Sequence, residues 1–505
     1  MNLRTIAFLL LLLGGAQALA AGRPEITHGV ASGDVADGQA VIWSRCDRPA
    51  RMVVEVSVDG GDTVSHLGPA ALAHQDFTAK YVLRDLPAGA EVAYAVSFQS
   101  LEDPELSSEP ARGSFRTPPA ESRNITFAWS GDTAGQGWGI DPARGGMKIY
   151  AAIRELAPQF FIHSGDMIYA DNPLAAEVKL ADGSTWSNLT TPAKSKVAET
   201  LDEFRGNFRY NLLDGHLREF NAAVPLYVQW DDHETTNNWF PGEQLVLDDR
   251  YSVKSAALLA ARARQAFFDY NPIMGNARDP QRIYRHFRYG PDLEIFLVDL
   301  RSYRGENSEN RQAAGQPGAV LFGEDQRAWL EGALTNSEAT WKIVASDMPI
   351  GLVVGDGKHH EGIANGDPGG PAGRETEIAS LLAALKAAGT RNVVWLTADV
   401  HYAASHHYHP DRASFGDFDP FWEFVSGPLH AGNFGPNQLD PTFGPEVKFS
   451  SAKKGNAVNQ APGKDNQFFG LVEFDAGSKA LTISQRNQAG EVVFQVTLPP
   501  SAGGG

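Results

Sequence analysis

The chain has 505 residues, of which 42% are hydrophobic and 21% are charged, and its formal net charge is −18. These values are typical of globular proteins and exclude wholesale disorder, and the length allows two or three domains. The acidic excess argues against a nucleic-acid-binding module and against docking on an anionic membrane, because basic residues supply the affinity for both. A site for an anion must therefore obtain its positive charge locally, from metal ions, arginines or helix N-termini.

Residues 1–21 predict a signal peptide. One arginine precedes an apolar run, and the small residues of "ALA" follow it as a cleavage site. The alternative is a membrane anchor, but the run is short for a bilayer span, and Gly14, Gly15 and Gln17 interrupt it. We therefore expect a secreted or periplasmic protein with no transmembrane segment after signal cleavage, exported by the general secretory route because no twin arginine is present.

Residues 22–118 predict a β-sandwich domain. Segments such as "RMVVEVSV" and "FTAKYVLRDLPAGAEVAYAVSF" alternate apolar and polar residues between Gly, Asp and Pro. About seven short strands in fewer than about a hundred residues are typical of immunoglobulin-like or fibronectin-like sandwiches. Cys46, the only cysteine, is interpreted as a packing residue, since it has no partner for an intrachain disulfide.

Residues 119–505 predict an α/β domain. Its expected strands are "NITFAWSGD", "PQFFIHSGD", "VPLYVQWDD", "LEIFLVDLR", "TWKIVASDMP" and "RNVVWLTADVH", with "QFFGLVEFD", "ALTISQRN" and "EVVFQVTL" closing the chain. Its expected helices are "GGMKIYAAIREL", "VKSAALLAARARQAFFDY" and "TEIASLLAALKAAG". This alternation indicates buried strands covered by helices. "LADGSTWSNLTTPAKSK" and "GDGKHHEGIANGDPGGPAG" are predicted to be long loops.

The central apolar runs end in acidic residues, namely Asp132, Asp166, Asp231, Asp232 and Asp399. Ligands of open α/β sheets bind beyond the carboxyl ends of the strands, so these side chains are expected to converge. Each aspartate alone has an ordinary explanation as a turn former or a helix cap. Converging carboxylates repel one another unless cations lie between them, so their repetition at one topological position favours a site for more than one metal ion.

Further candidate ligands lie close to these acids in the sequence: Tyr169, His233, Asn237 and His401. Phenolate and amide oxygens and imidazole nitrogens complement carboxylates around hard or borderline cations. A later group, His406, His407 and His409, is expected in a loop near the rim of the site.

These segments resemble a known family. "GDTAG", "GDMIY", "DDHE" and "ADVH" occur in the order and rough spacing of the metallophosphatase motifs, and "WDDHETTNNW" and "TADVHY" are the most specific. Together with "HGVASGDVADGQAVIWSR" and "LVDLRSYR", they resemble the PhoD-type alkaline phosphatases of the calcineurin-like superfamily, which are related in site layout to purple acid phosphatases. The resemblance spans nearly the whole mature chain. It implies a metallophosphatase αββα sandwich preceded by the N-terminal β-sandwich.

The resemblance also implies a binuclear centre of Fe³⁺ with Ca²⁺, other divalent ions being possible. Asp166 would bridge the two ions. The ligands of the ferric ion would then be completed by Asp132, Tyr169 and His401. The second ion would be faced by Asp232, Asn237 and Asp399.

Two more residues acquire roles from the resemblance. His233 would be the catalytic group that hydrogen-bonds the phosphate or the leaving oxygen. Arg301 would bind the substrate phosphate, with a buried ion pair to Asp299 as the alternative.

The chain departs from the family pattern in two places. Asp132 stands where well-known members have a cysteine, which leaves the first metal open. Asp347 stands where related acid phosphatases have a histidine ligand, and we interpret it as a strand-end acid rather than a ligand.

The predicted function is a secreted, monomeric, metal-dependent hydrolase that releases phosphate from small phosphate esters by in-line attack of a metal-bound hydroxide. The alternative from the same site is a phosphodiesterase or phospholipase-D-like activity. A non-catalytic calcium-binding adhesion protein is disfavoured, because tyrosine and histidine are poor ligands for simple calcium storage. A serine hydrolase using Ser130 or Ser164 is disfavoured, because neither serine lies in a G-x-S-x-G turn.

Overall fold

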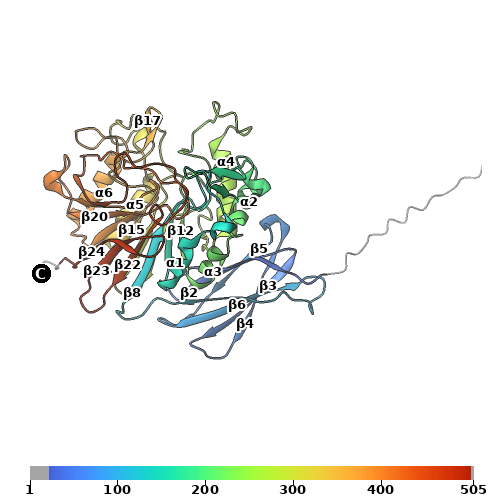
Figure 1. Ribbon diagram of the computed structural model, residues 1–505. Helices are drawn as coiled ribbons and strands as arrows, with labels where there is room; N and C mark the ends of the chain where they lie inside the picture. The colour runs from blue at the N-terminus through green and yellow to red at the C-terminus, as the bar shows by residue number, and fades with distance from the viewer. Residues whose placement is uncertain (1–21, 502–505) are drawn as a thin grey trace, which may run out of the picture.

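The computed structural model describes residues 22–501, so the predicted signal peptide lies outside the described residues. Two large β-sheets face each other (Figure 1). The first has nine strands in the order β24 (Val492–Leu498), β23 (Leu481–Asn487), β22 (Phe468–Phe474), β8 (Ile125–Ser130), β9 (Phe161–Ser164), β12 (Leu226–Gln229), β1 (Ile26–Ala36), β2 (Gln39–Cys46) and β5 (Thr78–Leu83). The second has seven, in the order β13 (Arg285–Tyr289), β14 (Leu293–Leu297), β15 (Trp341–Ala345), β18 (Val393–Thr397), β20 (Phe421–Val425), β19 (Ala404–Tyr408) and β21 (Pro445–Ser450).

The space between the two sheets is an apolar core. Side chains of the central strands fill it, among them Phe127, Trp129, Ile162, Ile295, Ile343 and Leu396. Two buried glutamines tie the sheets together. The Nε2 atom of Gln229 donates to the carbonyls of Val298 (2.7 Å) and Ala345 (2.9 Å), and that of Gln485 donates to two carbonyls of the same facing sheet. Because Gln229 is the last residue of β12, this bridge holds the sheets together where the strands end.

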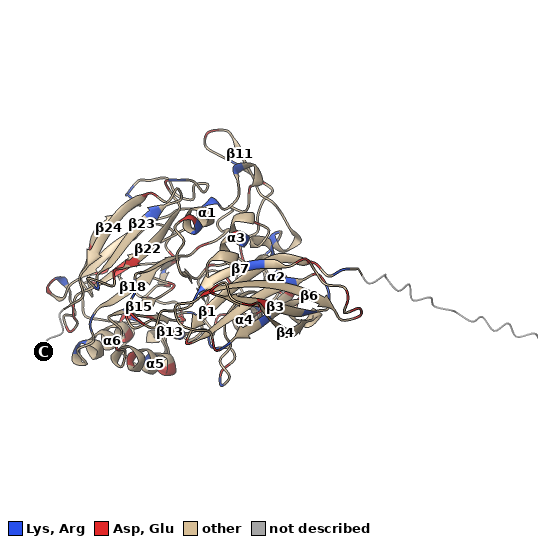
Figure 2. Cartoon of the chain, turned by 90° about the horizontal axis from the view of Figure 1, so that it is seen from below, with Lys and Arg blue, Asp and Glu red and all other residues tan. Residues whose placement is uncertain are grey.

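Helices cover the outer face of each sheet. The nine-stranded sheet is covered by α1 (Lys148–Glu155), α2 (Leu201–Asn211), α3 (Gly215–Ala223) and α4 (Ala256–Tyr270). The seven-stranded sheet is covered by α5 (Glu324–Thr335) and α6 (Glu375–Ala387), which lie side by side (Figure 2). The arrangement is the predicted αββα sandwich, and α2, α3 and α5 are additions to the predicted helices.

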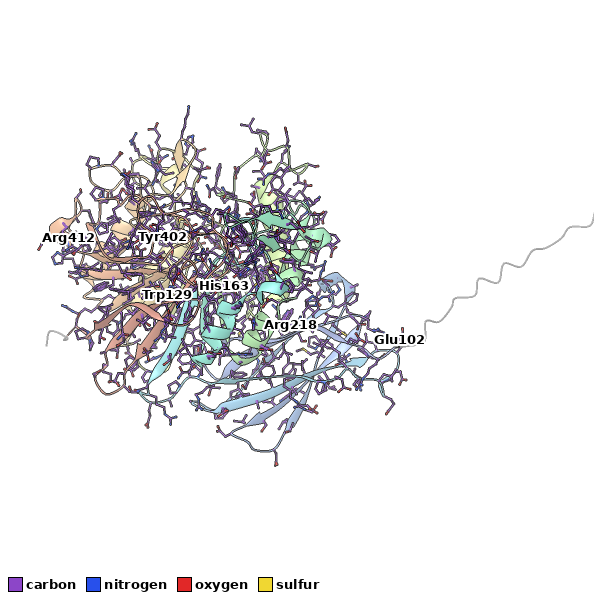
Figure 3. All side chains as sticks on the ribbon, viewed as in Figure 1. Glu102, Trp129, His163, Arg218, Tyr402 and Arg412 are labelled. Carbon is purple, nitrogen blue, oxygen red and sulfur yellow. The ribbon has the colours of Figure 1, made fainter. Side chains whose placement is uncertain are left out.

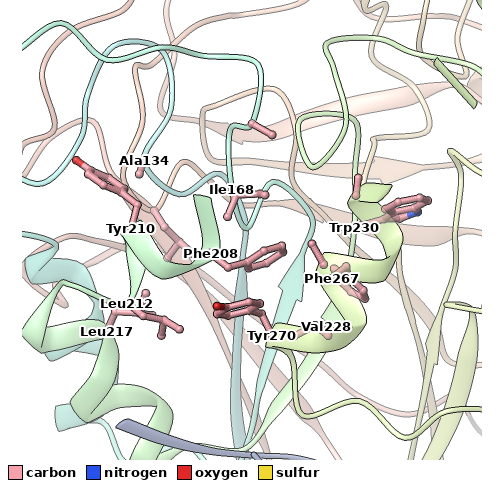
Figure 4. Close-up of a cluster of buried hydrophobic side chains, with 14 of the residues drawn as sticks. Ala134, Ile168, Phe208, Tyr210, Leu212, Leu217, Val228, Trp230, Phe267 and Tyr270 are labelled. Carbon is pink, nitrogen blue, oxygen red and sulfur yellow. The ribbon is translucent and has the colours of Figure 1, made fainter. Parts of the chain in front are cut away.

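Aromatic side chains hold the helices to the first sheet. Phe208 of α2 stacks on Tyr270 of α4 with ring centroids 5.6 Å apart (Figure 4). On the other side of α4, Phe267 packs against Trp230, the residue that follows β12. The helix that carries Tyr270 and Phe267 therefore contacts both α2 and the segment that leads into the acidic residues.

The N-terminal strands form a sandwich that shares a sheet with the rest of the molecule. A four-stranded sheet, in the order β4 (Val64–Ala71), β3 (Ala50–Val58), β6 (Glu91–Ser100) and β7 (Ala111–Arg116), packs on β1, β2 and β5. Cys46 is fully buried in this core, in agreement with its predicted packing role. Figure 3 places Glu102 at the outer end of this sandwich and Trp129 and His163 inside the larger body.

Charged side chains reinforce the contact between the sandwich and the helices. Asp76 accepts hydrogen bonds from Arg45, from Arg209 of α2 and from Tyr270 of α4. Lys80 of β5 donates to the carbonyl of Phe268 in α4 (2.8 Å). The sandwich is thus joined to the helices by polar bonds as well as by the shared sheet.

Short elements occupy the two predicted long loops. The first, residues 180–196, follows β10 (Glu177–Lys179) directly and contains β11 (Thr185–Ser187), which pairs with β10 as a hairpin. The second contains β16 (Gly355–Asp356) and β17 (His359–His360). Single-turn 3₁₀ helices span Ala73–Gln75, Pro142–Arg144, Pro192–Lys194, Pro317–Ala319 and Pro410–Arg412. Between residues 22 and 501, no helix is long and apolar enough to cross a membrane.

For His406 and His407 the prediction of a rim loop is wrong, whereas His409 lies outside the strand. His406 and His407 belong to strand β19, and the Nδ1 atom of His406 lies 3.3 Å from Glu423 of β20. His409 caps a 3₁₀ turn by accepting a hydrogen bond from the backbone of Asp411. The buried carboxylate of Glu423 therefore explains why the polar residue His406 is tolerated inside the sheet.

We expect Gly33→Ala to destabilise the protein at the seam between sandwich and body. Gly33 pairs with Leu226 where β1 meets β12, and a Cβ atom there would lie 2.6 Å from the carbonyl oxygens of Leu226 and Pro272. Such overpacking costs roughly 1–3 kcal/mol of unfolding free energy. In the matched control Gly332→Ala, inside α5 and with open space around it, the free energy should rise by about 0.5–1 kcal/mol. Denaturant unfolding measures both, and an unchanged Gly33 variant would contradict the close packing of this seam.

Candidate metal centre

Acidic side chains meet where the strands of both sheets end. Asp132, Asp166, Asp231 and Asp399 each lie two residues beyond the end of β8, β9, β12 and β18, respectively. Since β8, β9 and β12 are parallel neighbours, their carboxyl ends lie at one edge. The sheets therefore bring together acids that are far apart in the sequence.

Several site residues have a left-handed backbone. The φ angles are 70° at Asp132, 51° at Asp166, 69° at Asp399 and 59° at His401. This conformation is uncommon for residues other than glycine and is tolerated best by Asp, Asn and His. Its recurrence here indicates that the turns after the strands are shaped to aim side chains into the site rather than to relax the chain.

The first group of candidate ligands consists of Asp132, Asp166 and His401, each offering one ligand atom within 4.8 Å of the others. The Tyr169 hydroxyl lies 2.7 Å from Nε2 of His401, so the phenol belongs to the same group. The Nδ1 atom of His401 lies 2.5 Å from the carbonyl of Gly432, and this bond fixes the ring and leaves Nε2 toward the site. Burial lowers the pKa of His401 to about 4, so the ring is neutral, as a metal ligand requires.

A second group overlaps the first, because Asp166 also lies within 4.8 Å of ligand atoms of Asp232 and His233. Asp231, Asp232 and Asp399 form a third such group. Asp166 is thus shared by the first and second groups and Asp232 by the second and third, so the three groups form one continuous cluster.

The candidate ligands border a cavity at this edge of the sheets, and the remaining predicted ligand, Asn237, lines it with an exposed residue. Its backbone N–H donates to Asp171 (2.9 Å). The cavity measures about 330 Å³ and is lined by Gln136, Asp166, Asp232, His233, Asn237, Asn238, Val354, Gly355, Glu361, Asp399, Val400, His401, Phe434 and Asn437.

Many of the buried carboxylate oxygens have no hydrogen-bond partner among the described residues. They are both oxygens of Asp132 and of Asp347, and one each of Asp231, Asp232, Glu361 and Asp399. Buried polar atoms are nearly always paired, and an unpaired cluster of anionic oxygens is the donor set that cations satisfy. The residues at this edge therefore fit a metal centre.

Burial and mutual repulsion govern the acid–base behaviour of these carboxylates. Burial, together with the charge of Asp231, raises the pKa of Asp132 well above its usual value. Burial and the charge of Asp232 raise the pKa of Asp166 in the same way. Burial and the charge of Glu361 raise the pKa of Asp399. Bound cations favour the ionised form of such groups and reverse this tendency.

His233 is held by an acid that sequence reasoning missed. Its Nδ1 atom lies 2.7 Å from Oδ1 of the buried Asp171, and its ring packs on Tyr169 with centroids 4.3 Å apart. Burial alone would lower the pKa of His233, but Asp171 and Asp232 outweigh it and raise the pKa to about 9. The two carboxylates therefore favour the protonated form of the ring.

Arg301 lies beneath the acids and is fully buried. Its Nε atom contacts Asp231 (2.5 Å), and one Nη atom contacts Glu361 (2.6 Å). The ion pair with Asp299 that we considered as an alternative is not formed by the Arg301 side chain, since Asp299 accepts from the backbone N–H of Arg301 instead (3.1 Å). Arg301 is not among the residues that line the cavity.

Sequence reasoning also missed Glu234 and Glu361. Glu234 accepts hydrogen bonds from the backbone of Met167 (2.6 Å) and of Asp231 (2.8 Å), so it ties the turns after β9 and β12 together. Its place in "DDHE" was a signal for this role. Glu361 comes from the predicted long loop and gave no such signal.

Asp347 is fully buried, 3.7 Å from the Arg301 side chain, and belongs to none of the three ligand groups.

Comparisons with known proteins relate the chain to a phosphatase family. The sequence model of the PhoD-like phosphatase family matches residues 127–485, and that of its N-terminal domain matches residues 14–119. Alkaline phosphatase D of Bacillus subtilis is 26% identical over 453 residues, which cover 82% of this chain and 71% of that protein.

Two solved structures share the fold. A PhoD structure aligns with a TM-score of 0.68 and 20% identity, covering 95% of this chain and 90% of that one. The purple acid phosphatase PPD1 from yellow lupin (Lupinus luteus) seeds aligns with a TM-score of 0.57 and 12% identity, covering 94% of this chain and 74% of that one. Because the family match extends over more than half of its length, the chain belongs to the PhoD-like phosphatase family.

Proposed function

We propose that this phosphatase hydrolyses phosphate esters with a binuclear metal centre held at the carboxyl ends of the strands. The observation that carries the proposal is the overlap of two ligand groups at Asp166, amid buried carboxylate oxygens that lack partners among the described residues. Two cations supply a nucleophile near neutral pH and neutralise the charge that develops on the phosphoryl oxygens. As the sequence predicts, we propose that the enzyme is secreted or periplasmic and monomeric.

We assign Asp132, Tyr169 and His401 to the first ion and Asp232, Asn237 and Asp399 to the second. The phenolate of Tyr169 and the carboxylate of Asp132 are hard anionic ligands suited to Fe³⁺. The second set offers only oxygen ligands, which suit Ca²⁺. Arg301 and Arg304 supply further positive charge next to these acids through their contacts with Glu361.

In this proposal His233 donates a hydrogen bond to the phosphate or to the leaving oxygen. Its Nδ1 atom is engaged by Asp171, which leaves Nε2 as the ring atom available to a substrate in the cavity. A protonated imidazole at this position stabilises negative charge on the phosphoryl group and can protonate a leaving alkoxide.

A second candidate activity, phosphodiester hydrolysis, is favoured by the lining of the cavity. Val354, Val400 and Phe434 offer apolar surface, and no lysine or arginine is among the lining residues of the described chain. Such a wall suits a singly charged diester that carries an organic group on each side of the phosphorus.

We expect Asp166→Ala to abolish both metal content and hydrolysis, because it removes the ligand shared by the two groups. Elemental analysis of the purified protein and assays with a chromogenic monoester and a bis-ester measure the two effects. Asp182→Ala, at an exposed turn of the β10–β11 hairpin, is the matched control and should leave both unchanged. Retention of metal and activity in the Asp166 variant would overturn the proposal, and the ratio of the two wild-type rates decides between monoester and diester hydrolysis.

We expect Asp171→Asn to move the alkaline limb of the kcat/KM profile to lower pH. The carboxylate of Asp171 helps to raise the pKa of His233 to about 9, so activity that needs the protonated ring is present below that pH and is lost above it. Removing the carboxylate should shift this limb by about one unit or more. If the limb stays in place while kcat falls, a group other than His233 titrates there.

A further inference from the structure

The guanidinium of Arg301 forms a junction between the acids beneath the site. Nε bonds Asp231 and one Nη bonds Glu361, at 2.5 and 2.6 Å. The second Nη atom has no hydrogen-bond partner among the described residues and lies 3.8 Å from Asp232 and 3.7 Å from Asp399. One planar cation thus hydrogen-bonds Asp231 and Glu361, lies 3.7 Å from Asp347, and is within 4 Å of two candidate ligands of the second ion.

The anchor on the Glu361 side is itself held in place. Arg304 shares the same Glu361 oxygen, at 3.1 Å. Arg374, also fully buried, donates to the carbonyls of His360 (2.6 Å) and Gly362 (2.9 Å), which flank Glu361. A residue from a loop with little regular structure is therefore fixed from three directions.

We propose that Arg301 is a positioning residue for the second metal ion and does not bind the substrate. It orients Asp232 and Asp399 by attraction from below and offsets part of their repulsion, so that the two carboxylates keep their places before and after an ion binds. Its full burial and its absence from the cavity lining separate it from the substrate. The inference rests on the proposed metal centre, but it assigns to Arg301 a role other than the phosphate clamp that the family resemblance implies.

Geometry explains why this position needs arginine. A guanidinium offers five donors in a rigid plane and can engage two acids while facing two others. A lysine ammonium is a compact charge on a flexible stem, and from this site it would satisfy Asp231 or Glu361 but not hold both. Arg301→Lys therefore keeps the charge and removes the positioning.

The test is Arg301→Lys, assayed for metal affinity and for steady-state kinetics. We expect the dissociation constant of the more weakly bound ion, measured by titrating the metal-depleted protein with Ca²⁺, to rise about 10-fold or more. At saturating metal, kcat should fall while KM stays within about twofold, because losing an oriented ligand weakens the transition state more than ground-state binding. A phosphate clamp would behave oppositely, with a raised KM and unchanged Ca²⁺ affinity, and that outcome would overturn the inference.

Arg285→Lys is the matched control. Arg285 forms an ion pair with the buried Asp34 (2.8 Å) that none of the three ligand groups includes, so its variant reports the cost of disturbing an arginine–aspartate pair away from the site. Equal Ca²⁺ affinities in the two variants would refute a positioning role. If Arg301→Lys does not fold, Arg374→Lys decides in its place, since Arg374 holds the carbonyls on both sides of Glu361 without lining the cavity, and its loss should raise the Ca²⁺ dissociation constant in the same direction. A wild-type protein that binds no metal refutes the metal centre itself, an outcome distinct from failure of the Arg301 comparison.

Discussion

Repulsion among carboxylates that converge at one edge of two sheets is the constraint on which the rest of the structure depends. Burying ionised acids without compensation costs several kcal/mol for each group. The molecule meets this cost with groups of its own, chiefly Arg301 beneath the acids and the cationic ring of His233 beside them. Ligand atoms of these acids lie within 4.8 Å of one another in groups that could hold cations, and several of the carboxylate oxygens have no hydrogen-bond partner within residues 22–501.

The architecture around the edge keeps these acids from moving apart. Gln229 binds the two sheets where β12 ends, and Glu234 binds the turns that carry Asp166 and Asp231. Gly135 lets the ring of Tyr169 approach, since a Cβ atom there would lie 2.4 Å from it. Rigid turns of this kind hold ligands in place at the expense of local backbone strain.

Much of this could be predicted from the sequence, for a physical reason. A buried strand is a run of apolar residues, so an aspartate that follows it can be recognised in the sequence. Because parallel strands end at the same edge of a sheet, such aspartates lie close together in the structure. Asp132, Asp166, Asp232 and Asp399 were found in this way. The β-sandwich and an α/β domain of buried strands follow from the same periodicities, whereas the αββα layering is implied by the family resemblance.

Other features depend on contacts between distant segments and leave no local pattern. Glu361 lies in a loop rich in glycine, and only the fold brings it to Arg301. The sequence around Arg301 is compatible both with a buried side chain and with one that reaches a substrate, so it does not distinguish the two. Strand β19 was mistaken for a loop because His406 is polar, although Glu423 pairs with it inside the sheet. The sandwich shares a sheet with the larger body through the pairing of β1 with β12. The sequence of neither strand indicates this pairing.

The nine-stranded sheet has a consequence for how the protein is made. It joins β1, near the start of the described chain, to β22–β24 at its end, and β8 is paired on one side by β22 (Figure 1). The sheet cannot close until the ribosome has delivered the last strands, and contacts over such sequence separations form slowly. A nascent chain of this design remains incomplete throughout its synthesis. This delay suits a polypeptide that is threaded through a membrane before it folds, as the proposed export requires.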